Sequence, residues 1–497
     1  MTKAQALDLL FGKINDVLAL GMAESLFLWD ATTSGVPAKS LGVRGAAAGW
    51  LSGEAFRRLI APDTLEAVET LESIGGELSV YEAAMVREIG RKYRKFKAIP
   101  PDEFQAFMAL AAQSEPVWEA ARSKRDFDMM LPYYDKIFDF LRRKCDCFGF
   151  DAHPYDALLD EYEMGATVEI LDGFFNTMRE KIVPLLGEIT KRGKQPRTVT
   201  GAFDISGQRA LAPWLTGFVG YDLSRGKIGE VQHPYCTSLC RNDVRITTKY
   251  HENQLFSAIY STIHESGHAL YEQNMDLELE RYYLAIAPSM GLHESQSRFF
   301  ENMICRSRTF AGLLLPKLRE QYDYFSDWDE EALFRAVNIA RPSFIRIEAD
   351  ELTYCLHIIV RYELEKALMA GEIKASMLPQ LWDDKYEELL GVRPGNVAEG
   401  VLQDVHWSRG YIGYFPSYAV GTAYGAQFMH AMRKTVDVES AVKNSDLSPV
   451  VEWMKENVHR HGRVMITDDL LVQATGESFN HKYYVDYLTE KFTGLYL

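Results

Sequence analysis

Long apolar runs are missing from this sequence of 497 residues, and positive charge is scarce in it. A membrane-spanning helix needs about 20 consecutive apolar residues, and no stretch approaches that length, so we expect no membrane partner. The chain carries 54 Lys+Arg against 70 Asp+Glu, which gives a formal net charge of −16. Because this surplus of negative charge repels a phosphate backbone, nucleic acid is excluded as an expected partner.

Cysteine is also sparse, with 6 residues scattered along the chain. This is too few for a secreted disulfide scaffold of this length and is typical of a reduced compartment. The pair Cys236 and Cys240 lacks the second half of a zinc ribbon, so we predict free, buried thiols there. Residues 1–21 have the period of an amphipathic helix and lack the unbroken apolar core of a signal peptide. The expected location is therefore cytoplasmic.

Linkers, repeats and low-complexity tracts are absent, so residues 1–497 are predicted to form one domain with lobes. What the sequence does contain is helical periodicity. Apolar residues recur at spacings of three and four in the segments 102–123, 128–148, 167–190 and 349–371. The predicted fold class is therefore mostly α.

Strand-like alternation is confined to one short region. Residues 243–250 ("DVRITTKY") alternate, and residues 227–235 are a candidate partner across the turn-prone "CTSLCRN". We therefore expect one small antiparallel β-sheet just ahead of a helix over residues 255–275. An exposed strand edge in that place can hold an extended peptide through backbone hydrogen bonds.

The stretch "YSTIHESGHALYEQ" (Tyr260 to Gln273) contains the most specific motif. His264 and His268 are four residues apart, so on a helix both imidazoles lie on one face and can share one ion. Glu265 then lies near the ion without necessarily binding it. This HExxH pattern is typical of zinc metallopeptidases, in which it supplies two ligands and a general base. The alternative interpretation is a pair of ordinary surface or core histidines.

A hydrolytic zinc site needs a third protein ligand and an open position for water. The metzincin continuation is excluded, because Tyr271 and Asn274 stand where that class has glycine and histidine. Among the carboxylates that follow, Glu272 lies one turn further along the same helix, and residues 276–280 are typical of a solvated helix end. Glu294 lies on a second predicted helix, which can approach the metal from another side. We predict Glu294 as the third ligand.

Five segments together resemble the Taq-type metallocarboxypeptidases in their order and residue types. Weaker likeness extends over nearly the whole chain. One departure is visible, because the approach to the strand reads "GKIGEVQHPY" where the family usually has an arginine and an aspartate. The five segments are "DVRIT" (243–247), "HESGH" (264–268), "HESQ" (293–296), "IRIEAD" (345–350) and "GVLQDVHW" (400–407).

The resemblance implies a zinc carboxypeptidase that removes single amino acids from the C-terminus of peptides, with broad side-chain tolerance. It also implies an almost entirely helical, two-lobed metallopeptidase fold with a deep central groove, and a homodimer. Zn²⁺ is the expected ion, with Co²⁺ or Mn²⁺ as substitutes that support activity. By carry-over, His264, His268 and Glu294 are the expected ligands, and Glu265 is the expected catalytic carboxylate.

In the expected mechanism, one side chain transfers the proton and others stabilise the oxyanion. Glu265 would take a proton from the attacking water and deliver it to the leaving amine. The developing oxyanion needs a donor besides the metal. His406 is the predicted donor, although a packing histidine is the alternative. Tyr418 is the predicted helper, with Tyr411 and Tyr414 as alternatives.

A carboxypeptidase must also recognise a free carboxylate, for which the planar fork of arginine is well suited. Arg346 and Arg245 are the candidates, and Arg346 is preferred. The alternative is structural ion pairing, of Arg346 with an acid of its own motif and of Arg245 with Asp243. Asp404 is predicted to orient a ligand histidine.

Two other functions remain open. An oligopeptidase or dipeptidyl carboxypeptidase would keep the metal chemistry and cut elsewhere, depending on the distance from metal to arginine. An inactive peptide-binding scaffold would keep a vestigial metal site. The intact Glu265 argues against a scaffold, because degenerate sites tend to lose the base before the ligands. The expected partners are peptides with a free C-terminus.

Overall fold

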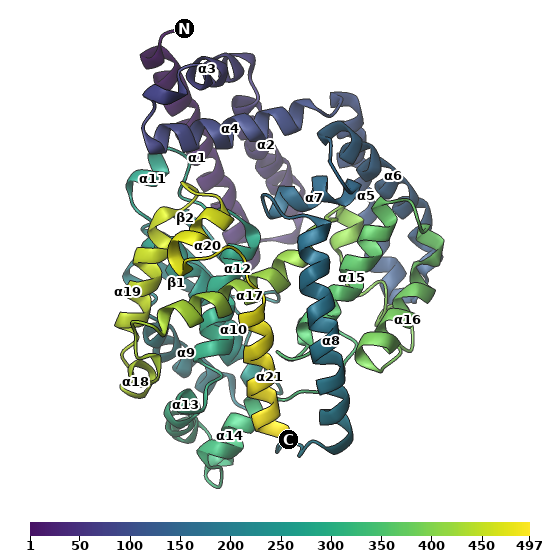
Figure 1. Cartoon of the computed structure of the whole chain (residues 1–497), viewed down its shortest axis with the longest axis vertical. Helices are drawn as coiled ribbons and strands as arrows, with labels where there is room; N and C mark the ends of the chain where they lie inside the picture. Colours follow the sequence, from purple (N-terminus) through teal and green to yellow (C-terminus); the bar gives the residue numbers. More distant parts are fainter.

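The computed structural model describes residues 1–497, and helices make up most of the chain (Figure 1). The predicted mostly α fold is therefore confirmed. None of the helices has the length and apolar character that crossing a bilayer requires. The helices before the sheet are α1 (Lys3–Thr33), α2 (Leu41–Leu59), α3 (Pro62–Glu72), α4 (Val80–Lys97), α5 (Pro101–Lys124), α6 (Leu131–Phe148), α7 (Pro154–Tyr162), α8 (Val168–Arg192) and α9 (Ile205–Val219). The helices after it are α10 (Leu255–Asn274), α11 (Glu278–Arg281), α12 (Met290–Arg298), α13 (Arg308–Gln321), α14 (Glu330–Val337), α15 (Tyr354–Met369), α16 (Leu378–Leu390), α17 (Phe415–Met432), α18 (Val438–Lys443), α19 (Ser448–Asn457), α20 (Thr467–Thr475) and α21 (Lys482–Tyr496).

The sheet has the strand order β1-β3-β2 and is mixed. β1 (Gly226–Glu230) pairs parallel with β3 (Asp243–Thr248), and β2 (Cys236–Cys240) pairs antiparallel with β3. The prediction of a purely antiparallel sheet is wrong in this respect, because "CTSLC" is a strand and not a turn. Its small polar residues suit both structures, so the sequence pattern does not separate them. Cys236 and Cys240 are free, as predicted, but only half-buried.

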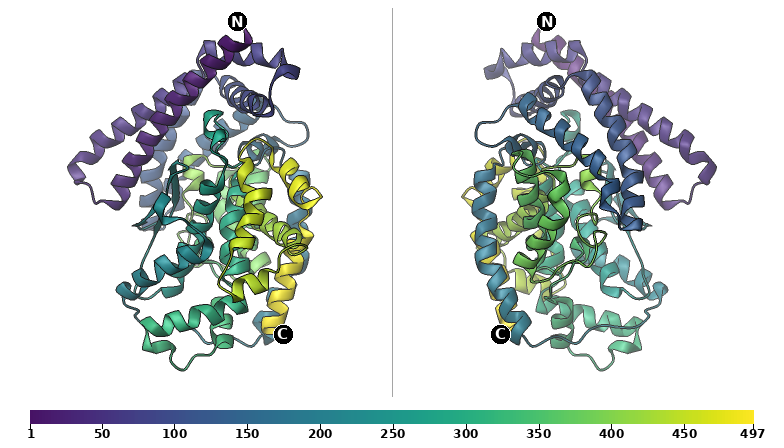
Figure 2. Two further views of the ribbon diagram at one scale, coloured as in Figure 1. Left: turned by 90° about the vertical axis from the view of Figure 1, so that its left-hand side faces the viewer. Right: turned by 90° about the vertical axis from the view of Figure 1, so that its right-hand side faces the viewer.

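The hydrophobic core is divided unevenly along the chain. The main cluster contains 97 buried residues and runs from Ile99 to Tyr496. A separate cluster of 9 residues joins α1, α3 and α4, while α2 buries no residue completely. Figure 2 shows α1 and α2, in purple, as a pair of long helices that extends away from the rest of the molecule. We call α1 to α4 the N-terminal arm.

Helix α12 starts at a defined residue. Ser289 Oγ accepts a hydrogen bond from the Leu292 amide at 3.1 Å, which satisfies a donor that the first helical turn leaves free. Pro288 comes directly before this cap and disfavours continuation of a helix from upstream. The cap therefore fixes the position of Glu294, which lies in the second turn of α12.

Two glycines let α10 and α17 approach α12 closely. A Cβ atom at Gly267 of α10 would lie 2.7 Å from the carbonyl oxygen of Gln296 on α12. A Cβ atom at Gly421 of α17 would lie 2.9 Å from the Cβ atom of Glu294. Because a packed interior has no room for such overlaps, any larger residue would push the helices apart. The close approach brings the histidine-bearing face of α10 next to Glu294.

Candidate metal centre and active site

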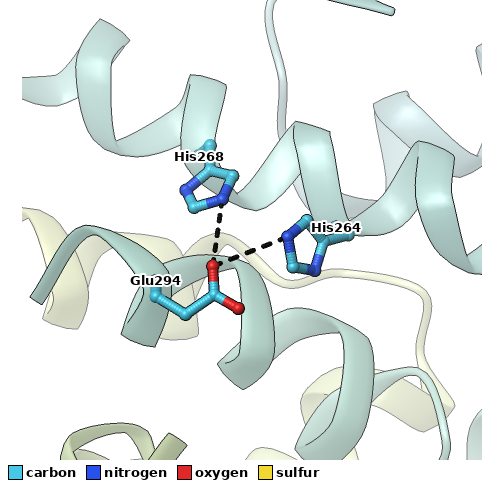
Figure 3. Close-up of side chains that lie close together, drawn as sticks. All are labelled: His264, His268 and Glu294. Atoms are coloured by element: carbon cyan, nitrogen blue, oxygen red, sulfur yellow. Dashed lines mark ion pairs between the residues drawn. The ribbon is translucent and has the colours of Figure 1, made fainter. Parts of the chain in front are cut away.

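Three side chains from two helices meet where α10 packs against α12 (Figure 3). His264 and His268 lie one turn apart on α10 and point toward the Glu294 carboxylate on α12. Glu294 Oε2 lies 3.7 Å from His264 Nε2 and 3.5 Å from His268 Nε2. The structure thus brings together the three side chains that the sequence predicts as ligands. Glu272 is not part of this group, and its Oε1 lies 3.1 Å from His293 Nε2.

The spacing of these donors fits a divalent metal ion. Ligand atoms that lie about 2.0–2.1 Å from a tetrahedral ion are separated from each other by about 3.3 Å. One donor atom from each side chain lies within 4.8 Å of the others, so small side-chain movements suffice to reach that geometry. Two imidazoles and one carboxylate also form the ligand set of a zinc hydrolase, which leaves a fourth position for water.

Glu301 fixes the orientation of the His264 ring. Its Oε2 lies 2.9 Å from His264 Nδ1, so Nδ1–H donates to the carboxylate and the Nε2 lone pair faces the other ligands. Glu301 belongs to a π-helical turn (Phe299–Ile304) that continues α12. Such turns are common at functional sites. The sequence gives no indication of Glu301 and predicts this kind of support from Asp404 instead; in the structure Asp404 pairs with Arg346 and Arg361 and does not contact His264 or His268.

Arg298 is a second supporting residue, and it is not among the residues predicted from the sequence. Its Nε donates to Glu294 Oε1 at 2.8 Å and its Nη1 donates to Glu301 Oε2 at 3.3 Å. Burial alone would raise the pKa of Glu294, but the protonated form of His264 and the charge of Arg298 hold that pKa well below its usual range. Glu294 is therefore anionic, as a metal ligand must be. The signal available in the sequence is the spacing of Glu294 and Arg298 at four residues, which places them on one helix face.

Burial also controls the charge of the two remaining HExxH side chains. Glu265 is only 7% exposed, and burial raises its carboxyl pKa to about 7. Burial lowers the pKa of His268 to about 3, so its imidazole is neutral and has a lone pair for a cation. The His268 Nδ1 atom is buried without a hydrogen-bond partner.

An aromatic group that contains His406 and Tyr418 lies close to this centre. The ring of Tyr414 lies 5.5 Å from the ring of His406 and 5.2 Å from the ring of Tyr418. Burial lowers the pKa of His406 to about 4 and raises the pKa of Tyr418 well above its ordinary value. Both side chains are therefore neutral near pH 7 and can donate hydrogen bonds. Tyr411 is 45% exposed, which makes it the least enclosed of the three tyrosines.

Arg346 and Arg361 share a single buried carboxylate. Asp404 Oδ1 lies 2.8 Å from Arg346 Nη2, and Asp404 Oδ2 lies 2.6 Å from Arg361 Nη2. Two positive charges thus face one negative charge, and a positive charge remains. The Arg346 guanidinium lies 5.0 Å from the ring centre of Tyr418. The predicted alternative pairing of Arg346 with an acid of its own motif is wrong, because the partner comes from a distant segment.

Arg245 pairs with Asp243, as the alternative interpretation predicts. Its Nε and Nη2 atoms lie 2.7 Å and 2.6 Å from the two carboxylate oxygens of Asp243. The guanidinium also lies 5.3 Å from the ring centre of Trp29. This one-to-one pair leaves no excess positive charge, in contrast to the charge that remains at Arg346.

The order of these motifs and their geometry agree with a known family. The family described as "Carboxypeptidase Taq (M32) metallopeptidase" matches residues 10–492. The chain belongs to this metallocarboxypeptidase family. It is therefore a peptide hydrolase of the carboxypeptidase type, and the resemblance that the five sequence segments indicate is confirmed.

Named relatives and a solved structure support the same assignment. The metallocarboxypeptidase chain is 40% identical to carboxypeptidase 1 of Bacillus subtilis over 479 residues, which cover 96% of this chain and 95% of that protein. It is 36% identical to thermostable carboxypeptidase 1 of Pyrococcus furiosus, with 97% of each chain covered. The M32 carboxypeptidase of Deinococcus radiodurans superposes with a TM-score of 0.94 at 34% identity, and 99% of each chain is covered.

A cavity of about 530 Å³ borders the metal centre of this metallocarboxypeptidase. His264, Arg298 and Tyr354 are among the residues that line it. The Tyr354 hydroxyl accepts a hydrogen bond from Arg346 Nη1 at 3.2 Å, and the Tyr354 ring centre lies 4.4 Å from the Arg298 guanidinium. We call this the metal-side cavity. One tyrosine therefore separates Arg346 from the arginine that holds Glu294.

Proposed function

We propose that this metallocarboxypeptidase removes single amino acids from the C-terminus of peptides, with Zn²⁺ bound by His264, His268 and Glu294. The observation that supports this most strongly is that donor atoms of all three lie within 4.8 Å of one another. Co²⁺ and Mn²⁺ accept the same ligand types and are expected to support activity. When bound, the ion polarises a water molecule and the scissile carbonyl.

Glu265 is the proposed general base. It follows His264 on α10, and its burial keeps competing solvent away. In the proposed reaction its carboxylate takes a proton from the attacking water and delivers it to the nitrogen of the leaving amino acid. Glu301 and Arg298 position the ligands and do not exchange protons with the substrate.

His406 and Tyr418 are the proposed donors to the oxyanion. Both are neutral near pH 7, because burial lowers the pKa of the imidazole and raises the pKa of the phenol. Donors that are already fixed and desolvated stabilise a developing negative charge without reorganisation. The buried His406 Nδ1 atom has no partner in the protein, which supports a role in binding substrate.

Arg346 is the proposed binding site for the substrate carboxylate. The excess positive charge beside Asp404 supports Arg346 over Arg245, whose charge Asp243 balances. Because only Tyr354 separates Arg346 from the Arg298–Glu294 pair, the site suits one amino acid beyond the scissile bond. A dipeptidyl carboxypeptidase or oligopeptidase would need a longer distance there. The intact Glu265 argues against an inactive scaffold.

We further propose that the chain is a single domain of two lobes that flank the groove, and that it works as a homodimer in the cytoplasm. The main core supports one domain, because a single cluster of 97 buried residues has members from Ile99 to Tyr496. Exposed apolar side chains on the N-terminal arm support a second copy. Val43 is 77% exposed and Trp50 is 60% exposed, and a subunit contact would cover them.

A peptide ladder tests this function. Peptides with a free C-terminus are expected to shorten one residue at a time, and mass spectrometry of the products shows each step. The same peptides with a C-terminal amide are expected to remain intact, because the carboxylate that Arg346 binds is missing. Release of dipeptides, or cleavage of the amidated peptides at internal bonds, would support the oligopeptidase type of enzyme instead.

Arg346→Gln is expected to lower kcat/KM for peptides with a free C-terminus by about 10- to 100-fold, because a charge-assisted hydrogen bond is worth about 1.5–3 kcal/mol. Asp404 keeps Arg361 as a partner in this variant, so the fold is expected to persist. Arg245→Gln is the matched control and is expected to change kcat/KM by less than about threefold. Steady-state kinetics on one peptide measures both. A larger loss of kcat/KM in Arg245→Gln than in Arg346→Gln would mean that Arg245, and not Arg346, binds the substrate carboxylate.

A further inference from the structure

A second cavity, of about 370 Å³, lies where the N-terminal arm meets the rest of the molecule. Its walls come from α2, α4, α5, α6 and α7 and from the start of α12. Of the 18 residues that line it, 11 are hydrophobic, so it suits an apolar group. Its volume is within the range of about 300–1,000 Å³ that ligand sites occupy. We call it the arm cavity.

One face of α12 connects the arm cavity to the metal centre. Met290, Glu294 and Arg298 are spaced four residues apart and therefore lie on the same helix face, about 6 Å from one to the next. Met290 lines the arm cavity, and Arg298 lines the metal-side cavity. Since Glu294 lies between them, the two cavities are on opposite sides of the metal centre along this helix.

The aromatic group near the metal centre makes a second connection. Tyr162 lines the arm cavity, and its ring lies 5.2 Å from the ring of Tyr414. Tyr414 in turn contacts the rings of His406 and Tyr418, which are the proposed oxyanion donors. Two of its wall residues, Met290 on α12 and Tyr162 through its contact with Tyr414, thus connect the arm cavity to the proposed reaction site.

The position of Arg346 sets the direction of a bound peptide. Arg346 donates to Tyr354, which lines the metal-side cavity, and its guanidinium also lies 5.0 Å from the ring centre of Tyr418. In the proposed orientation the C-terminal residue lies between Arg346 and Glu294 on the Tyr354 side, and the rest of the peptide leaves toward Met290. An extended chain advances about 3.3 Å per residue, so two residues cover the distance of about 6 Å along α12. Residues about two to four positions before the scissile bond thus reach the arm cavity.

The arm cavity is also locally positive in a chain of net charge −16. Five cations line it, and three acids pair with four of them. Lys92 has no carboxylate partner; its Nζ donates to the Tyr283 hydroxyl at 3.2 Å and lies 4.5 Å from the centre of that ring. The cations are Arg91, Lys92, Lys95, Lys144 and Arg463, and the acids are Asp160, Glu161 and Glu88.

We infer that the arm cavity is a substrate subsite that binds apolar and acidic side chains on the amino-terminal side of the scissile bond. The apolar walls accept the body of a side chain, and Lys92, whose charge no protein carboxylate neutralises, attracts a substrate carboxylate. The inference rests on the proposed function, since it places the peptide by the carboxylate at Arg346. The subsite would make the enzyme select peptides by the residues that precede the scissile bond, in addition to the residue that is removed.

Two blocked peptides of equal length test the subsite. Both end in the same residues, and they differ only in Glu or Lys at the third position before the scissile bond. The wild-type protein is expected to show a kcat/KM about fivefold to tenfold higher for the Glu peptide, mainly through KM. Lys92→Glu is expected to bring this ratio to one or below, and Lys92→Gln is expected to give an intermediate ratio.

Lys97→Glu is the matched control. Lys97 lies on α4 like Lys92 but is exposed and outside the cavity, so both variants change the net charge equally. The control is expected to keep the wild-type ratio. An equal rate for both peptides in the wild type, or an equal shift in the control, would overturn the subsite. In either case, continued removal of C-terminal residues would leave the proposed function intact, whereas failure to shorten both peptides would refute that function.

Discussion

Glu265→Gln is expected to lower the rate of peptide shortening by about 10²–10⁴-fold while the protein keeps its metal. The amide has nearly the shape of the carboxylate but cannot take the proton from water, which is the contribution that a general base makes. The proposed ligands are on other residues, so metal binding is expected to persist. Initial rates with a free C-terminal peptide measure the loss, and elemental analysis of the same sample measures the metal.

Glu278→Gln is the control for this variant. Glu278 is exposed on α11 and pairs with no cation. The rate of peptide shortening and the metal content of this variant are therefore expected to match the wild type. Full activity in Glu265→Gln would remove Glu265 from the mechanism. Loss of metal together with activity would instead make Glu265 a ligand, which contradicts the proposed division of roles.

Asp404→Asn is expected to lower the free energy of unfolding by about 3–5 kcal/mol. Asp404 is the anion between Arg346 and Arg361, and removal of one partner of a buried ion pair leaves an uncompensated charge. Chemical denaturation measures the loss. Asp243→Asn is the control, because its partner Arg245 is partly exposed, and a loss below about 1 kcal/mol is expected. Equal losses in the two variants would mean that the buried ion pair contributes no more to the free energy of unfolding than the partly exposed pair does.

The effect of Asp404→Asn is also expected to depend on pH. Burial alone would raise the pKa of Asp404, but Arg346 and Arg361 hold that pKa well below its usual range. The ion pair therefore stabilises the fold fully above the unfolded pKa of about 3.9, and this contribution is lost as pH falls toward the folded pKa. Between pH 7 and pH 3 the difference between wild type and variant is expected to narrow by about 1 kcal/mol. A difference in the free energy of unfolding that stays constant between pH 7 and pH 3 would contradict a negative charge on Asp404 in the folded protein.

The proposed ligand triad could be predicted from the sequence because its geometry is mostly local. The spacing of His264 and His268 places two proposed ligands on one helix face, whatever the rest of the fold does. Glu294 required one further step, the recognition of a second helix after a proline and glycine break. The glycines at 267 and 421, which let the helices approach closely, carry no such signal in a single sequence.

The remaining features depend on contacts between distant segments. Asp404 is 58 residues from Arg346 in the sequence, and neither motif indicates that the two side chains form an ion pair. Glu301 supports His264 across 37 residues from a π-helical turn that helical periodicity does not predict. β1 and β2 pair with opposite edges of β3, and the sequence of the strands does not indicate which edge each one takes. Tertiary packing determines these contacts, and local propensity does not.

Anomalous X-ray diffraction from crystals grown with Zn²⁺ tests the three-ligand centre most directly. We expect one peak at the zinc edge, about 2 Å from His264 Nε2, His268 Nε2 and one oxygen of Glu294. Glu301 is expected to remain on His264 Nδ1 in the same crystals. A peak bound by other side chains, or zinc bound to the histidines with Glu294 outside its reach, would contradict the proposed centre and the hydrolysis that depends on it.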